Sequence, residues 1–427
     1  MHLAGASVRS IGLDTWGVDF GLLDEQDTLI GNPYHYRDQR TDGMMEALFG
    51  IVSRDDVYSK TGIQVMQINS LYQLFSMVKR NASALSHAEY FLNMSDLFNF
   101  FLTGNKANEF TISSTTQCYN PIKKIWDFEM LTQLGIPSKI FGEIVKPGTL
   151  LGKLHPSIAQ EIGYSTSVIS SAGHDTACAI AAVPAADGDF IYLSSGTWSL
   201  MGVLLDQPII NTDSMAAEMT NEGGVDGKIR FLKNIVGLWL VQECRRQWKR
   251  EGQEYSYDDL TKMAEKVPPF ASLIVPGESR FLSPKNMQNE IQTYCHESDQ
   301  PVPESKGAII RTVLESLALE YRWVAEQIDR LTGKSYPLIH IIGGGTQNKL
   351  LNQFAANATG RNVIAGPVEA TAIGNILIQS IAMGDITSLA EGRAIVRNSF
   401  EVESYEPTDL SAWDEAYSRY KKLKKGI

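Results

Sequence analysis

The sequence predicts an α/β protein built from two domains, and three observations support this fold class. The chain has 427 residues, which is long for a single hydrophobic core. Hydrophobic residues make up 43% and charged residues 20% of it, as is typical of a globular protein. Its last third alternates strand-like and helix-like segments separated by glycines, which is the pattern of an α/β unit.

Charge and cysteine content narrow the classes of function. The net charge is −11, from 38 basic and 49 acidic residues, which argues against a nucleic acid or a membrane surface as partner. The four cysteines form no Cys-x-x-Cys pair, so we expect reduced thiols and a cytoplasmic protein rather than disulfides or a zinc site. No apolar run approaches the ~18 residues of a membrane helix, and we expect no signal peptide.

The first half begins with strand patterns. Residues 10–14 and 18–23 predict two strands, and the polar turn at 24–27 predicts a hairpin that resumes at Leu29. Helical patterns follow near residues 71–79 and 96–102.

Small residues and tight turns dominate the middle of the chain. A strand at 168–170 leads into the small-residue run 171–177. A second strand, 191–193, ends in the turn 194–198, and apolar residues return at 200–203. This predicts a strand, a tight turn and another strand.

The last third carries the clearest periodicity. Residues 309–331 predict a long amphipathic helix that ends at Gly333. A short buried strand, 338–342, runs into the glycines 343–345 and then a helix that ends at Gly360. The remaining elements expected are a strand at 363–365 and helices at 372–383 and 409–425.

One run of residues resembles a phosphate-binding loop but lacks two features that such a loop requires. Gly333-Lys334-Ser335 resembles the end of a P-loop, but that motif needs a glycine at position 328, where Ile328 stands, and a preceding strand. We interpret it as a helix C-terminus. The chain also lacks a strand–GxGxxG–helix pattern, which argues against a dinucleotide-dependent oxidoreductase.

Two turns are candidate phosphate or nucleotide contacts. The run 343–345 follows a buried strand and opens a helix, where backbone amides favour anions, although a simple strand-to-helix turn has the same pattern. Ser195-Gly196-Thr197 offers amides and hydroxyls to phosphate oxygens, although a hairpin turn would look alike.

Asp175 is the candidate base. It lies among small residues after a buried strand, where a carboxylate can take the proton of an acceptor hydroxyl in phosphoryl transfer. The alternative is an aspartate that only caps its own helix, and His174 is interpreted as a hydrogen-bonding neighbour. The order of acid, hydroxyl turn and glycine run favours a kinase of a small hydroxylated molecule.

Several runs then resemble a known family, and two of them, Asp14-Thr15-Trp16-Gly17-Val18-Asp19 and Ser194-Ser195-Gly196-Thr197-Trp198-Ser199-Leu200, are specific. The runs are residues 11–20, 36–41, 173–177, 193–202, 221–224, 232–239, 341–348 and 365–370. They resemble the FGGY carbohydrate kinase family from about Ser10 to the C-terminus.

The resemblance implies two ribonuclease-H-like (actin-like ATPase) domains with the active site in the cleft between them. We expect a sugar-binding domain at 1–184, a nucleotide-binding domain at 185–398, and a C-terminal helix within 399–427 that packs back on the first domain. Family members open with a strand and hairpin carrying an Asp-x-Gly phosphate motif. This sequence enters the strand at Ser10 directly, so the first domain is expected to lack its first strands.

The implied reaction is ATP-dependent phosphorylation of L-rhamnulose to L-rhamnulose 1-phosphate in rhamnose catabolism, by a monomer or homodimer. Mg²⁺ would arrive with ATP, held largely by phosphates and water. The alternatives are a kinase of L-fuculose or another ketose, or a sugar- and nucleotide-binding variant impaired by the missing N-terminal loop.

The resemblance also assigns site residues, with no resident metal ligand among them. Asp175 would accept the proton of the sugar hydroxyl. The sugar site would comprise Gly17, His174, Asp175, Thr176 and Asn234. The ATP site would comprise Gly196, Thr197, Gln242, Gly343, Gly344, Gly345 and Asn348.

Overall fold

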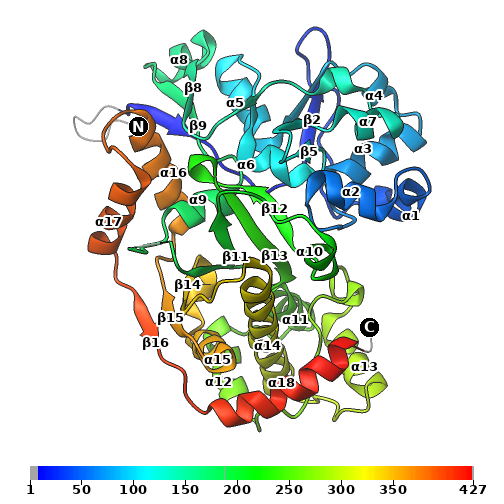
Figure 1. Cartoon of the computed structure of the whole chain (residues 1–427), viewed down its shortest axis with the longest axis vertical. Coiled ribbons are helices and arrows are strands. Elements are labelled where there is room, and N and C mark those ends of the chain that lie inside the picture. Colours follow the sequence, from blue (N-terminus) through cyan, green and yellow to red (C-terminus); the bar gives the residue numbers. More distant parts are fainter. Residues whose placement is uncertain (1–7, 187, 426–427) are drawn as a thin grey trace. The chain divides into compact units, whose positions relative to one another are not determined.

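The computed structural model describes residues 8–186 and 188–425, and the chain divides into two compact units (Figure 1). Unit 1 comprises Met1–Ala186, Leu204–Leu232 and Ala370–Val396. Unit 2 comprises Asp187–Val203, Lys233–Glu369 and Arg397–Ile427. The units are therefore interleaved, whereas the expected second domain was one continuous segment, because two later segments return to unit 1.

Unit 1 contains small sheets covered by helices. Its strands are β1 (Ser10–Gly12), β2 (Phe20–Leu23), β3 (Tyr90–Asn93), β4 (Asn108–Glu109), β5 (Tyr119–Asn120), β6 (Ile125–Trp126), β7 (Ile144–Val145), β8 (Thr149–Lys153), β9 (Ser167–Ser170), β12 (Thr220–Gly223) and the first half of β13 (Ile229–Val236). Strand β9 pairs in parallel with β1 and antiparallel with β8. Strand β2 pairs antiparallel with β3, and the expected hairpin after it is reduced to one bridge between Leu23 and Leu29.

The helices of unit 1 are mostly short. They are α1 (Met44–Phe49), α2 (Arg54–Thr61), α3 (Ser70–Lys79), α4 (Ser83–Ser86), α5 (Met94–Thr103), α6 (Phe110–Ser113), α7 (Phe128–Gln133), α8 (Pro156–Ile162), α9 (Asp175–Ala181), α10 (Thr212–Ala216), α16 (Ala370–Ala382) and most of α17 (Leu389–Ser399). The predicted helices at 71–79 and 96–102 are confirmed as α3 and α5.

Aromatic rings fill the core of unit 1. The Phe91 ring lies 4.8 Å from that of Phe20 and 5.2 Å from that of Phe141, and Trp126 lies 4.9 Å from Phe141. The buried indole of Trp126 donates to the carbonyl of Gly142, so its one polar group is satisfied. This cluster fixes β2 and β3, and the chain reaches the candidate site directly before β2.

Unit 2 is built on a sheet that runs in the order β11-β10-β14-β15-β16. The central pairs β10–β14 and β14–β15 are parallel, and the outer pairs are antiparallel. Its strands are β10 (Ile191–Ser195), most of β11 (Trp198–Leu205), the second half of β13, β14 (Leu338–Ile342), β15 (Asn362–Ala365) and β16 (Glu403–Tyr405). Its helices are α11 (Trp239–Arg250), α12 (Tyr257–Glu265), α13 (Met287–Glu297), α14 (Lys306–Thr332), α15 (Lys349–Thr359) and α18 (Leu410–Lys425).

The long helix α14 confirms the periodicity of the last third. It ends at Gly333, whose φ of 68° is the left-handed C-cap that glycine favours. The P-loop-like run at Gly333 is therefore a helix C-terminus, as predicted. Among residues 8–186 and 188–425, no helix combines the length and apolarity that a membrane span requires.

The C-terminal helix α18 is placed differently from the expectation. It packs on α14 and α15 within unit 2 (Figure 1), so the prediction that it packs back on the first domain is wrong. The Trp413 ring lies 5.1 Å from Phe354 of α15, and the Tyr417 hydroxyl donates to Glu326 of α14 at 2.6 Å. The aromatic face of α18 thus packs its rings on α15, and a tyrosine hydroxyl on it donates to an acidic side chain of α14.

Helix α16 returns to unit 1 and packs on α9 at very short range. A Cβ added at Gly374 would lie 1.8 Å from the carbonyl oxygen of Cys178, so only glycine permits this approach. The nearby Ala177 and Ala181 are also small and buried. The contact brings the side chain of Asn375 beside the loop that follows β1.

We predict that Gly374→Ala destabilises unit 1 by about 1–3 kcal/mol, because the clash is with helix backbone that cannot rotate away. The measurement is the unfolding midpoint in urea. The matched control is Gly277→Ala, at an exposed loop position with open space around the added Cβ, which should shift stability by less than about 0.5 kcal/mol. Equal midpoints for the two variants would contradict the packing argument.

Candidate active site

Two loops of unit 1 lie side by side and carry the sugar-site candidates. The amide of Thr15 donates to the carbonyl of Gly173, and the amide of Asp175 donates to the carbonyl of Thr15, both at 2.9 Å. The loop after β1 therefore continues the pairing of β1 with β9. This brings Gly17, in the loop after β1, near His174 and the first residues of α9, Asp175 and Thr176.

The buried carboxylate of Glu109 fixes the second loop. It accepts hydrogen bonds from the Gly173 amide at 2.8 Å, from the Thr111 amide and hydroxyl at 2.9 and 2.6 Å, and from the Ile112 amide at 3.1 Å. Burial raises the pKa of Glu109, and these donors lower it. An added Cβ at Gly173 would lie 2.5 Å from the Ser95 hydroxyl, so glycine is needed for this close approach.

Asp175 is the first residue of α9, and its side chain is 44% exposed. Its Oδ1 accepts from the amide of Thr176 at 2.6 Å and from the Thr176 hydroxyl at 3.1 Å. Within the described part of unit 1, no hydrogen bond reaches Oδ2. The N-cap position belongs to His174, so the alternative that Asp175 serves as the helix N-cap does not describe this structure.

His174 is buried behind Asp175 and has a charged environment. Its Nε2 lies 3.5 Å from Oδ1 of Asp175, and its Nδ1 lies 2.9 Å from the guanidinium of Arg230 and 3.4 Å from the carboxylate of Glu222. Arg230 and Glu222 belong to β13 and β12 of the same unit. His174 therefore lies between Asp175 and a buried ion pair.

The loop that carries Gly17 is strained. The next residue, Val18, has a φ of 68°, which is an outlier for a β-branched residue. The Val18 carbonyl accepts hydrogen bonds from the Ser70 hydroxyl at 2.6 Å and from the Gln73 side-chain amide at 3.1 Å, and both residues are on α3. Such strain costs about 1–3 kcal/mol and persists only where the surroundings enforce it.

Trp16 lies in the same strained loop. Its indole is 45% exposed, and its N–H donates to the buried carboxylate of Asp19 at 2.7 Å. This bond fixes an aromatic ring directly beside Gly17.

Four polar residues that shape the site were not predicted: Asp14, Glu109, Arg230 and Asn375. Burial raises the pKa of Asp14, the 2.5 Å hydrogen bond from Asn375 lowers it, and the nearby Asp175 raises it again. A local signal exists for one of them, because Asn375 is a polar side chain within the mostly apolar helix α16.

The nucleotide candidates lie in unit 2, at the ends of neighbouring strands. Because β10 and β14 are parallel neighbours, Gly343–Gly345 lies beside Ser195, and a Cβ at Gly345 would come within 2.0 Å of the Ser195 hydroxyl oxygen. The Thr197 hydroxyl donates to the Gln242 side chain at 3.2 Å, and the Gly196 carbonyl accepts from Leu238 at 3.0 Å. The turn, α11 and the glycine run are therefore gathered at one place.

Two further candidates have a structural partner of their own. Asn348 is the N-cap of α15, where its side chain accepts from the Leu351 amide at 3.0 Å. Asn234 lies on β13 in unit 2 and is partly exposed. A short 3-10 helix, Gly344–Gln347, begins within the glycine run and precedes α15, where the sequence predicted an α-helix directly.

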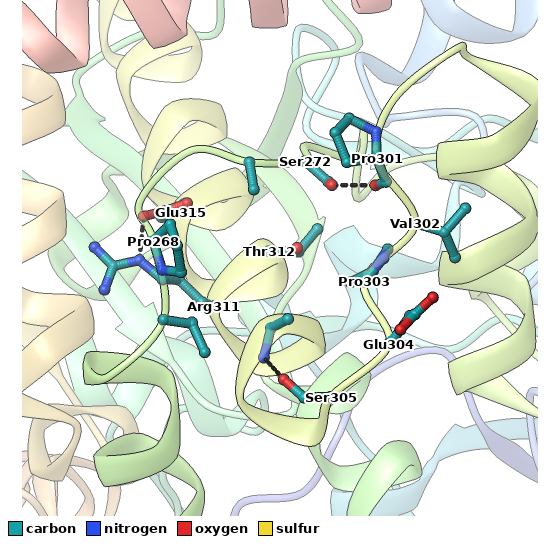
Figure 2. A pocket seen from close by; sticks show the side chains of 13 residues that line it. Pro268, Ser272, Pro301, Val302, Pro303, Glu304, Ser305, Arg311, Thr312 and Glu315 are labelled. Atoms are coloured by element: carbon teal, nitrogen blue, oxygen red, sulfur yellow. Dashed lines mark hydrogen bonds and ion pairs between the residues drawn. The ribbon is translucent and has the colours of Figure 1, made fainter.

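Unit 2 also has a pocket of about 350 Å³ that contains none of the predicted residues (Figure 2). It lies between the segments 267–272 and 301–305 and the start of α14. Figure 2 shows the Arg311–Glu315 ion pair, with a distance of 2.6 Å, on its α14 side. The predicted turns therefore lie outside this pocket.

Both halves of the chain match one protein family. The N-terminal domain of the FGGY family of carbohydrate kinases matches residues 1–182, and the C-terminal domain of that family matches residues 191–383. A rhamnulokinase of Bacteroides thetaiotaomicron is 47% identical over 418 residues, covering 98% of this chain and 85% of that protein. A rhamnulokinase of Oceanobacillus iheyensis is 43% identical over 396 residues, covering 93% and 83%.

Solved structures share the fold at low identity. A ligand-bound xylulose kinase from Lactobacillus acidophilus matches with a TM-score of 0.81 and 17% identity, covering 99% of this chain and 85% of that chain. Plasmodium falciparum glycerol kinase with ADP matches with a TM-score of 0.77 and 15% identity, covering 98% and 84%. The predicted fold class, a two-domain mixed α/β kinase fold, is confirmed. The chain is a carbohydrate kinase, and it belongs to the FGGY family.

A second buried carboxylate, Asp96, supports the Glu109 anchor and has a pKa held well above its ordinary value by burial and by Glu109. Its oxygens accept from the Glu109 amide and the Asn93 side chain, both at 3.1 Å. Because the folded state holds this proton to higher pH than the unfolded chain does, stability falls as pH rises above the ordinary value of 3.8.

We therefore predict that Asp96→Asn, which cannot ionise, gains stability relative to the wild type as the pH rises above the ordinary carboxyl pKa of 3.8. Asn93 can reorient to accept from the new amide, because its Oδ1 is buried without a partner. The control is Asp259→Asn on the surface, where hydrogen bonds from Ser256 lower the carboxyl pKa and the predicted sign is opposite. Thermal unfolding across this pH range measures both, and a gain independent of pH contradicts the assignment.

Proposed function

We propose that this chain transfers the γ-phosphate of ATP to the primary hydroxyl of L-rhamnulose, giving L-rhamnulose 1-phosphate. The observation that carries the substrate assignment is the 40–47% identity, over 93–98% of this chain, to relatives that bear the name rhamnulokinase. The matched length covers 93–98% of this chain and therefore spans both units.

In the proposed reaction, Asp175 accepts the proton of the sugar hydroxyl. Phosphoryl transfer asks the protein mainly for positioning and charge stabilisation, with one group to take the proton. Thr176 holds Oδ1 of Asp175 by two hydrogen bonds, which leaves Oδ2 to face the acceptor. Gly17, His174, Thr176 and Asn234 complete the proposed sugar site.

The nucleotide site is proposed at the turns of unit 2. Amides and hydroxyls of Gly196 and Thr197 would contact phosphate oxygens, with Gln242, Asn348 and the run Gly343–Gly345 along the nucleotide. The open space at the Cβ position of Gly344 suits a ligand lying flat on the backbone.

Mg²⁺ is proposed to enter with ATP. No group of three His, Cys, Asp or Glu side chains arranged for a metal occurs in the described parts of the chain, 8–186 and 188–425. The cation would be held largely by the phosphate oxygens of ATP and by water. There it would neutralise the negative charge of the transferring phosphoryl group.

We also propose that the reaction takes place in the cytoplasm. Cys118, Cys178, Cys244 and Cys295 are all free and buried, which suits a reducing compartment.

We predict that Asp175→Asn folds and binds ATP but loses about 100-fold or more in kcat, because the amide cannot accept a proton. Steady-state ADP release measures turnover, and titration calorimetry measures ATP affinity. The matched control is Asp55→Asn, which also removes a carboxylate from a helix first turn but whose side chain is exposed on α2. Near-normal turnover of Asp175→Asn would falsify the base assignment.

We further predict that L-rhamnulose gives the highest kcat/KM in a panel with L-fuculose, xylulose and glycerol. A site built to bind particular hydroxyls rejects analogues that leave its polar groups unpaired, by about tenfold or more. Equal or faster phosphorylation of another ketose overturns the substrate assignment. Binding of ATP and sugar without ADP release on any substrate overturns the kinase assignment for this chain.

A further inference from the structure

A buried ion pair lies behind the proposed sugar site. Arg230 of β13 and Glu222 of β12 are directly opposite in the antiparallel register, and their side chains are 3.0 Å apart. The Arg230 side chain is completely buried, and that of Glu222 is 5% exposed. The Arg230 Nε also donates to the carbonyl of Gly223 at 2.6 Å, which fixes the plane of the guanidinium.

Stability alone is a weak reason for such a pair. Removing two charges from water commonly costs as much as their attraction returns, and apolar replacements are often neutral or stabilising. The pair has a third partner, however. The Arg230 Nη2 lies 2.9 Å from Nδ1 of His174, the residue directly before the proposed base.

This contact determines the proton position on a neutral His174 ring. A guanidinium has five N–H donors and no acceptor, so Nδ1 must accept, and the ring proton is on Nε2. Glu222 lies 3.4 Å from the same Nδ1 and favours the opposite tautomer. Arg230 is closer to Nδ1, and it also neutralises Glu222, so its preference prevails.

The other ring nitrogen faces Asp175. Nε2 lies 3.5 Å from Oδ1 of Asp175, and Oδ1 also accepts from Thr176. Catalytic hydrogen bonds are often long before substrate binds and shorten in the complex. With Oδ1 occupied by donors from both sides, the second oxygen, Oδ2, is the one left for the acceptor hydroxyl.

We propose that Arg230 and Glu222 are positioning residues for phosphoryl transfer: they hold His174 as an acceptor at Nδ1 and a donor at Nε2, and so orient Asp175. The catalytic consequence rests on the proposed function, whereas the tautomer does not. No additional proton transfer is involved, since the sugar proton still goes to Asp175 and His174 keeps its own.

The first test is nitrogen NMR of the wild-type protein labelled with ¹⁵N-histidine. The chain has seven histidines, and His174→Asn identifies the signals of interest by their loss. We expect a neutral His174 with Nδ1 unprotonated and Nε2 protonated. A proton on Nδ1 overturns the proposal, whether or not the protein phosphorylates rhamnulose, so the two failures are distinguishable.

The second test uses the charge-free double variant Glu222→Met/Arg230→Met, which avoids leaving one buried charge unpaired. We expect a mixed His174 tautomer and a kcat lower by at least about tenfold, with the KM for ATP unchanged, as for other residues that orient a catalytic group. Arg230→Lys keeps a donor to Nδ1 and should retain the tautomer and most of the turnover. If the double variant does not fold, the tautomer and turnover of Arg230→Lys decide.

The matched control is Arg311→Met/Glu315→Met, which removes a second largely buried ion pair, at the unit 2 pocket drawn in Figure 2, whose lining contains none of the predicted site residues. It should leave the His174 signals and kcat unchanged. A purely structural role for Arg230 and Glu222 predicts the same stability loss in both double variants and no selective loss of kcat. That outcome, or a kcat within about twofold of the wild type for a folded Glu222→Met/Arg230→Met protein, overturns the proposal.

Discussion

The geometry around Asp175 depends on one buried carboxylate. Glu109 collects the amides of Thr111, Ile112 and Gly173, so a single anion joins the start of α6 to the turn before α9. A buried charge is tolerated only when hydrogen bonds satisfy it, and the donors around Glu109 supply that condition. If the Glu109 carboxylate moved, Gly173 would lose its side-chain hydrogen bond, and the backbone pairing of Thr15 with Gly173 would no longer be held in place.

Around this anchor, unit 1 concentrates polar groups that would be costly elsewhere. Asp14, Asp19, Asp96 and the Arg230–Glu222 pair are all at least partly buried within one unit. Each is held by specific partners, and the strained Val18 is held by two side chains of α3. Hydrogen bonds and ion pairs of this kind restrict the positions of the groups that make them. We infer that unit 1 gives up stability to hold the acceptor site in one arrangement.

The sequence could predict most regular elements because their signals are local. The periodicity of 309–331 and the glycine stops follow from neighbouring residues, and the ends of α14 at Gly333 and of α15 at Gly360 confirm them. The interleaving of the units could not be predicted in this way, since the return of 204–232 and 370–396 depends on distant contacts. The placement of α18 failed for the same reason: its partners, Glu326 and Phe354, are far away in sequence.

In the candidate site, too, some features follow from neighbouring residues in the sequence and others only from distant contacts. Asp175, Gly196 and the glycine run have local sequence signatures. Arg230 is linked to the site only by its contact with His174, which is 56 residues away in the sequence. Two of the glycines act through close packing. Gly173 lies against Ser95, and Gly345 lies against Ser195, at distances that no Cβ could adopt. At these two positions glycine therefore indicates rigidity rather than freedom, because the neighbouring groups occupy the volume that a side chain would need. A kinase that must direct a phosphoryl group to a sugar hydroxyl rather than to water benefits from turns with a single allowed position.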